Sequence, residues 1–127
     1  MTIYKHNSRL LPRDYFRIAL NAARETAAID ERFRLTDRAW EINDPLVMTP
    51  DDVAANKKPL LALYEEMARA GHAGAMRACA MIYFSGEIDG KPDHAAGLSW
   101  CEKAAEAGNE SARKMLPEMQ KYAVAPK

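Results

Sequence analysis

The apolar residues of this chain recur at steps of three and four, the period of an amphipathic helix. The spacing predicts a first helix from Asp14 to about Ile29, with an apolar stripe formed by Phe16, Ala19, Leu20, Ala23 and Ala27. A second stripe either continues this helix or begins another, and it consists of Ile29, Phe33, Thr36 and Trp40. Asn43-Asp44-Pro45 ends this part, because the residue before a proline is pushed out of helical geometry.

Capping signals place further helices in the rest of the chain. Thr49 is a good N-cap, and Pro50 followed by two aspartates predicts a short helical piece near Val53. Asn56 and Asp93 also suit N-caps, and they predict helices from about Lys57 to Ala70 and from about His94 to Ala107. In this register Pro59 falls in a first turn, where no intrahelical hydrogen bond is lost.

Glycines and prolines mark the other helix ends. Gly71 and Gly108 are expected to close the two helices in the left-handed conformation. Between them lies a predicted helix from Ala75 to Phe84, ended by Ser85-Gly86 and followed by a polar connection with turn signals. A last helix is predicted from about Glu110 to Tyr122, weakened at Pro117, before a frayed tail at 123–127.

One segment of the chain occurs twice. Residues 61–75 and 98–112 share a leucine start, an alanine-rich body, a glycine and a closing alanine, and Leu98 follows Leu61 by 37 residues. A period in this range is typical of stacked repeats, in which each unit buries its apolar face against its neighbours.

The residues of this period resemble the Sel-1-like repeat, a relative of the tetratricopeptide repeat. The resemblance covers residues 57–122, with one complete unit between two half units. The residues that carry it are Ala75, Cys79-Ala80, Tyr83, Gly86, Asp93, Gly97, Trp100-Cys101, the run from Lys103 to Gly108, and Ala112. Cys79 replaces the usual leucine, Ala80 the glycine and Gly97 the alanine, so the pattern of small and apolar residues is kept.

The resemblance implies an all-α fold of antiparallel helix hairpins, a fragment of an α-α solenoid. We expect a single domain over 1–127, with an N-terminal helical cap at 1–48 and the repeat region at 49–122. Small residues in the repeat, such as Ala80, Gly97 and Ala104, let the helices approach closely, while Tyr83 and Trp100 fill the spaces between them.

Composition narrows the classes of partner. The chain of 127 residues carries 18 basic and 18 acidic side chains, so no net field attracts nucleic acid or anionic lipid. It has no run of about 18 apolar residues that would span a bilayer, and no apolar leader. We therefore expect a cytoplasmic protein whose partner is another protein, with no nucleic acid, membrane or small-molecule substrate.

The residues that could support chemistry have simpler structural explanations. Cys79 and Cys101 lack metal-ligand spacing and are expected to be small buried hydrophobes. The three histidines, His6, His72 and His94, show no metal-binding pattern. The adjacent acids at 51–52 and 65–66 do not face each other on a helix. We expect no enzyme activity, no cofactor and no metal.

The resemblance also nominates a binding surface. In tetratricopeptide-like repeats the first helix of each unit lines the concave groove, and the register carries this role to six residues, Arg77, Met81, Phe84, Lys114, Glu118 and Lys121. An exposed Phe84 beside Met81, with charges at the edge, would suit protein recognition. Alternatively, Phe84 packs under the N-terminal cap.

The function that follows is binding of a partner protein through the helical-repeat surface. Two sharper hypotheses remain open at this point. One is an immunity or antitoxin protein that neutralises a cognate bacterial toxin, and the other is an adaptor or regulatory subunit of a signalling or secretion complex.

Overall fold

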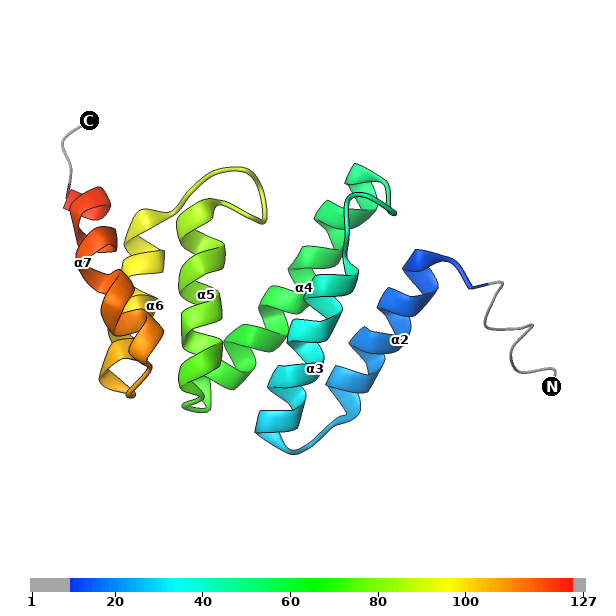
Figure 1. Ribbon diagram of the computed structural model, residues 1–127, viewed down its shortest axis with the longest axis horizontal. Helices are drawn as coiled ribbons and strands as arrows, with labels where there is room; N and C mark the ends of the chain where they lie inside the picture. The colour runs from blue at the N-terminus through cyan, green and yellow to red at the C-terminus, as the bar shows by residue number, and fades with distance from the viewer. Residues whose placement is uncertain (1–9, 125–127) are drawn as a thin grey trace. The chain divides into compact units, whose positions relative to one another are not determined.

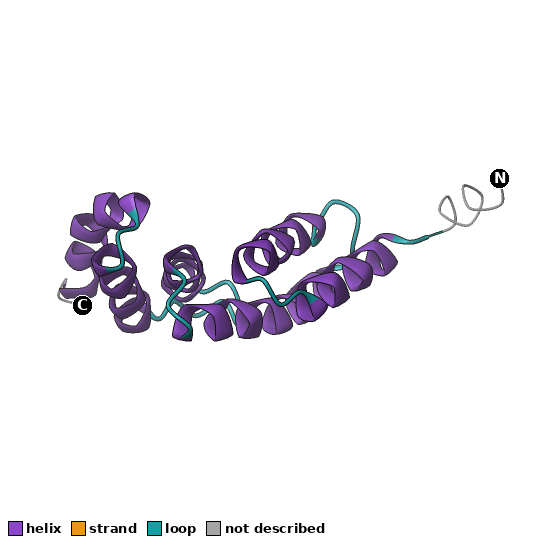
Figure 2. Cartoon of the chain, turned by 90° about the horizontal axis from the view of Figure 1, so that it is seen from below, coloured by secondary structure: helices purple, strands orange, loops and turns teal. Residues whose placement is uncertain are grey.

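The computed structural model describes residues 10–124, and within this range the protein is all-helical, as predicted (Figures 1 and 2). The described part of the chain contains six helices, α2 (Pro12–Glu25), α3 (Ile29–Ile42), α4 (Pro50–Arg69), α5 (Ala73–Ser85), α6 (His94–Glu106) and α7 (Glu110–Val124). Neighbouring helices pack against each other in the pairs α2–α3, α5–α6 and α6–α7, as in a helical-hairpin repeat. α7 continues through residues 123 and 124, which were expected to belong to a frayed tail at 123–127. The rest of that tail, His6 and the start of the expected cap lie outside the described residues.

The chain divides into two compact units, one up to Leu60 and one from Leu61 onward. The boundary falls inside α4, one residue after Pro59. The expected division into a cap at 1–48 and a repeat region at 49–122 stays a prediction.

In the first unit the two N-terminal apolar stripes belong to two separate helices. Phe16, Leu20 and Ala23 are buried on α2, as the periodicity predicts. The chain leaves helical geometry at Thr26, which has an extended backbone, so α2 ends before the expected Ile29. Ala27 is therefore exposed and does not extend the stripe. The break allows α3 to turn back and run in the opposite direction beside α2 (Figure 1).

The prediction of two helical pieces around Asn56 is wrong, because α4 is one helix from Pro50 to Arg69. Its start is as predicted, since the Thr49 hydroxyl oxygen accepts a hydrogen bond from the amide of Asp52 at 3.1 Å. Asn56 does not cap a helix, and its side-chain amide donates instead to the side-chain oxygen of Asn43 at 3.0 Å. Pro59 consequently lies in the helix interior rather than in a first turn.

A proline in a helix interior removes one backbone hydrogen bond and costs about 3 kcal/mol. Within the first unit, two long-range contacts hold the part of α4 that precedes Pro59. The buried Asn43 side chain donates to the carbonyl of Val53 at 3.0 Å, and the Lys57 ammonium lies 5.8 Å from the centre of the Trp40 ring. These contacts favour a helical conformation up to the proline.

In the second unit the repeat register is visible in the backbone. α5 ends with a glycine at positive φ, Gly86 (φ 71°), and a backbone bond from the amide of Glu87 back to Ile82 at 3.2 Å. The two helices separated by the 37-residue spacing, α4 and α6, end in the same way. The members are Gly71 (φ 100°) with His72 bonded to Met67 at 3.1 Å, and Gly108 (φ 97°) with Asn109 bonded to Ala104 at 3.0 Å. Both glycines therefore end helices, as predicted.

The same two turns also start the next helices. A His72 ring nitrogen, Nδ1, accepts a hydrogen bond from the amide of Ala75 at 3.1 Å, and the Asn109 side-chain oxygen accepts one from the amide of Ala112 at 2.8 Å. A single residue after each glycine thus takes part in closing one helix and caps the following one. This geometry recurs at the 37-residue spacing of the sequence.

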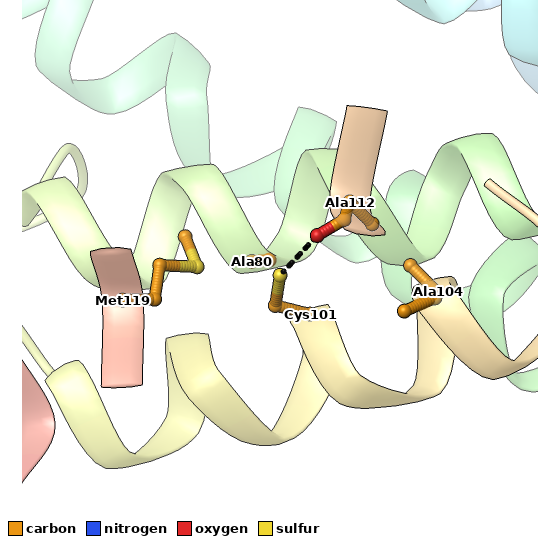
Figure 3. Packing of buried hydrophobic residues seen from close by; sticks show 6 residues of the cluster. Ala80, Cys101, Ala104, Ala112 and Met119 are labelled. Carbon is orange, nitrogen blue, oxygen red and sulfur yellow. Dashed lines mark hydrogen bonds between the residues drawn. The ribbon is translucent and has the colours of Figure 1, made fainter. Parts of the chain in front are cut away.

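One buried cluster of the second unit, shared by α5, α6 and α7, is built mostly from small residues, so these helices lie close together (Figure 3). Its buried members are Ala80, Cys101, Ala104, Ala105, Ala112 and Met119. The Cys101 thiol lies 3.4 Å from the carbonyl oxygen of Ala112, to which it donates. α5, α6 and α7 therefore share one core, to which half-buried larger side chains, such as Trp100 and Leu116, add at the edge.

Gly97 marks the closest approach of α5 and α6. A Cβ atom at this position would lie 2.8 Å from the Cβ of Phe84 and 3.0 Å from the carbonyl oxygen of Ala80. Both distances are shorter than the contact of about 3.5–4.0 Å at which two carbon atoms attract each other best. The absence of a side chain at Gly97 thus lets these two helices touch at the backbone.

We predict that Gly97→Ala destabilises the protein even though alanine is the better helix former. The added methyl group forces α5 and α6 apart, and a loss of roughly 1–2 kcal/mol in the free energy of unfolding is expected after the gain in helix propensity. Urea unfolding followed by circular dichroism measures it. Ser99→Ala, at an exposed position of the same helix, is the control; equal or greater stability of Gly97→Ala would contradict the packing argument.

Candidate interaction surface

The three predicted binding residues of α5 lie in different environments. The Met81 side chain is 42% exposed. Arg77 is half-buried, and its Nε is a buried donor with no hydrogen-bond partner within residues 10–124. Phe84 is half-buried rather than exposed, because it contacts the core formed with α6 and α7.

Phe84 forms an aromatic cluster with two residues of the second unit. Its ring stacks on the ring of His94 with centroids 4.4 Å apart, and the ring of Tyr122 meets it edge-on at 5.8 Å. Such pairs stabilise a structure by about 0.5–1.5 kcal/mol beyond the area they bury. In this arrangement Phe84 joins α5 to the start of α6 and the end of α7, and its role in partner binding stays a prediction.

The three predicted binding residues of α7 are all exposed. Lys121 pairs with Glu118 at 3.4 Å, one turn apart on the same helix, and Lys114 lies one turn earlier. An exposed pair of this kind contributes little to stability, so these charges are available for contacts outside the chain. Among the residues that the structure describes, no hydrogen bond or ion pair joins this trio to the trio on α5.

The arrangement nevertheless brings α5 and α7 together. Ala80 of α5 shares one buried cluster with Ala112 and Met119 of α7, and Phe84 contacts Tyr122. We call the surface formed by the half-buried Arg77 and the exposed Met81, Lys114, Glu118 and Lys121 the α5–α7 face.

Sequence reasoning missed an open hollow beside the connection between α5 and α6. It has a volume of about 600 Å³, and its polar and aromatic lining consists of Tyr83, Asp89, Lys91, Asp93, His94 and Tyr122. The two aspartates already serve the local structure. Asp93 caps α6 by accepting from the amide of Ala96 at 3.0 Å, and Asp89 accepts from the amide of Lys91 at 3.0 Å. The turn signals of this connection predict a loop, but they carry no information about the hollow.

Gly86 holds this connection in place. Its φ of 71° lies in the left-handed region, and a Cβ here would come within 2.7 Å of the backbone nitrogen of Pro92. The loop then returns to α5, where the amide of Asp93 donates to the carbonyl of Tyr83 at 2.8 Å. Tyr83 and Gly86 therefore fix the wall of the hollow.

A second contact that the sequence does not reveal joins α4 to α5. The Tyr83 hydroxyl donates a hydrogen bond to a carboxylate oxygen of Glu65. This bond, together with burial, raises the pKa of Tyr83 to about 12. Tyr83 is thereby held as a neutral donor, which suits a structural contact.

Both cysteines are buried, as predicted, and both are free thiols. Burial, reinforced by the nearby negative charge of Glu65, raises the pKa of the Cys79 thiol to about 12. Burial also raises the pKa of Cys101. Since the thiolate is the nucleophile and the metal ligand, these two side chains act as small apolar core residues at neutral pH.

Residues 10–124 contain neither a metal-binding cluster nor a membrane-spanning helix. No group of three or more His, Cys, Asp or Glu side chains there is placed so that it could hold a metal ion. Over the same range, no helix combines the length and apolar character that crossing a bilayer requires.

Comparison of the chain with protein-family models, with curated proteins and with solved structures finds no match.

We predict that alkaline pH weakens the fold through Cys79 and Tyr83. Their ordinary pKa values are 9.0 and 10.0. Between these values and about 12, the folded chain keeps protons that the unfolded chain has lost, so the free energy of unfolding falls as pH rises. Below about pH 9 this contribution is fully present.

Urea unfolding in the presence of a reductant, from about pH 8 to about pH 11, tests the effect. Cys79→Ala and Tyr83→Phe should each lose less stability over this range than the parent chain, and the Tyr83→Phe difference should begin at the higher pH. Identical pH dependence in all three proteins would refute the assignment.

Proposed function

We propose that this protein is a non-enzymatic interaction module of the Sel-1-like repeat type that binds a partner protein through the α5–α7 face. The observation that carries the proposal is the exposure of Met81 on α5, a helix whose other large apolar side chains are buried or half-buried. An unbranched thioether side chain adapts to varied partner surfaces and is common where proteins bind one another.

The surroundings of Met81 support this assignment. Gly74, Arg77 and Ala78 lie on the same side of α5 by their helical spacing, so the neighbours of Met81 on this side are mostly small. A partner can therefore approach the helix backbone closely. The charges of Lys114, Glu118 and Lys121 on α7 supply polar groups of the kind that surround an apolar contact.

Arg77 provides a second argument. A buried donor without a partner costs roughly 1–3 kcal/mol. A rotation of the Arg77 side chain toward an acceptor on a bound protein would remove this cost. Binding would thus satisfy a group that the described chain leaves unsatisfied.

The Sel-1-like assignment is supported by the paired turns after Gly71 and Gly108 and by the small residue at Gly97. A cytoplasmic location is part of the proposal. It is supported by two free cysteines, which reducing compartments maintain.

We expect Met81→Glu to reduce partner capture at least tenfold, because it places an uncompensated charge at the centre of the contact. The measurement is affinity capture of the tagged full chain from its native host, quantified by mass spectrometry. Ser99→Glu, which adds the same charge to an exposed position of α6, is the matched control. Melting temperatures of both variants verify that folding is kept.

The proposal fails if Met81→Glu and Ser99→Glu capture the same proteins in the same amounts as the parent chain. The identity of the protein that depends on Met81 also separates the two sharper hypotheses. A toxin would support an immunity role, whereas a signalling or secretion component would support an adaptor or regulatory role.

A further inference from the structure

The turn between α3 and α4 carries the most exposed large apolar side chain of the described residues. Leu46 is 90% exposed, and its neighbour Val47 is 56% exposed. Single exposed apolar residues are common on protein surfaces and need no explanation by themselves. Two adjacent ones at the tip of a rigid turn are different, because the fold holds them away from any core.

The turn is rigid because hydrogen bonds close it from within. A carboxylate oxygen of Asp44 accepts from the amide of Leu46 at 2.9 Å, and the Asp44 carbonyl accepts from the amides of Val47 and Met48 at 3.1 Å each. Pro45 fixes its own φ in the middle of the turn.

Both sides of the turn are anchored in the first unit. Before it, the buried Asn43 donates to the carbonyl of Val53 at 3.0 Å. After it, the Met48 side chain is buried. Leu46 and Val47 are therefore presented in one conformation, and binding through them requires little further ordering of the chain.

Along the sequence, the charged residues nearest the turn are all acidic. Asp44, Asp51 and Asp52 lie within or directly after it, and no lysine or arginine occurs from Ala39 to Asn56. Asp51 and Asp52 are exposed at the start of α4. A surface that accommodates this turn must combine an apolar centre with positive charge at its edge.

We propose that Leu46 and Val47 form an anchor that inserts into an apolar pocket, edged by lysine or arginine, on a partner protein. We call residues 44–47 the anchor turn. It lies in the first unit and is argued without reference to the α5–α7 face, so it is a separate interaction surface.

The acidic residues near the anchor turn argue against two other binding partners, a second copy of this chain and an anionic membrane. The open hollow of a second copy carries two aspartates, Asp89 and Asp93, against one lysine, Lys91, so its lining is not the basic edge that the acidic turn would pair with. An anionic lipid surface would repel these acidic residues. A basic, apolar pocket on a different protein is the complementary choice.

Photo-crosslinking in the native host tests the anchor turn with the full-length protein. The photoreactive residue p-benzoylphenylalanine replaces Leu46 in one variant and Ser99, which is exposed on α6, in the control. We expect an adduct with another protein at position 46 and none at position 99. Mass spectrometry should map the attachment to apolar residues that have lysine or arginine beside them.

A second variant tests the charge argument. Asp51→Asn with Asp52→Asn, added to the protein labelled at position 46, should lower the adduct yield about tenfold or more if the carboxylates pair with the partner. Melting temperatures verify that both labelled proteins are folded. The proposal is overturned by the absence of an adduct at position 46, by an adduct to lipid or a second copy, or by a yield that the two asparagines leave unchanged.

Discussion

The contact between α5 and α6 at Gly97 is the constraint on which the second unit depends. Because a side chain at this position would overlap Phe84 and Ala80, the two helices can touch only if residue 97 has no Cβ. Their contact brings the alanines and Cys101 of α6 into one core with α7. Small residues gain less from burial than large ones, so close packing must supply a large part of the stability.

The contact at Gly97 also positions the aromatic and polar side chains of the second unit. With α5 and α6 in contact, Phe84 meets His94 and Tyr122, and the connection between the helices is short enough to be closed by backbone bonds through Gly86. The polar side chains around the hollow are largely engaged in this closure or in caps. Such bonds fix a loop, and they leave the proposed binding role to the outer side of α5 and to α7.

The two units contrast in how they expose apolar groups. The second unit presents Met81 on a regular helix, whereas the first presents Leu46 and Val47 on a turn. A flexible methionine suits contacts that adapt to the partner, and a rigid turn suits insertion into a preformed pocket. Proposed binding through both surfaces would give a chain of this size two distinct modes of recognition.

Local signals in the sequence determined the all-helical class and most helix ends. Thr49, Gly71, Asp93 and Gly108 act where the sequence places them, because a cap is decided by hydrogen bonds within a few residues. The apolar spacing likewise identified the buried stripe of α2. These are properties of short segments, and no distant partner competes for them.

Only the tertiary structure decided the features that depend on residues far apart in the chain. Asn56 would cap a helix by local rules, but Asn43 offers its side chain another partner, and α4 continues through Pro59. The sequence does not reveal that Phe84 packs against His94 and Tyr122, which lie on two other helices. The bond between Tyr83 and Glu65 likewise joins two helices. In each case several residues could contact or hydrogen-bond the same side chain, and the packing of the helices selects one of them.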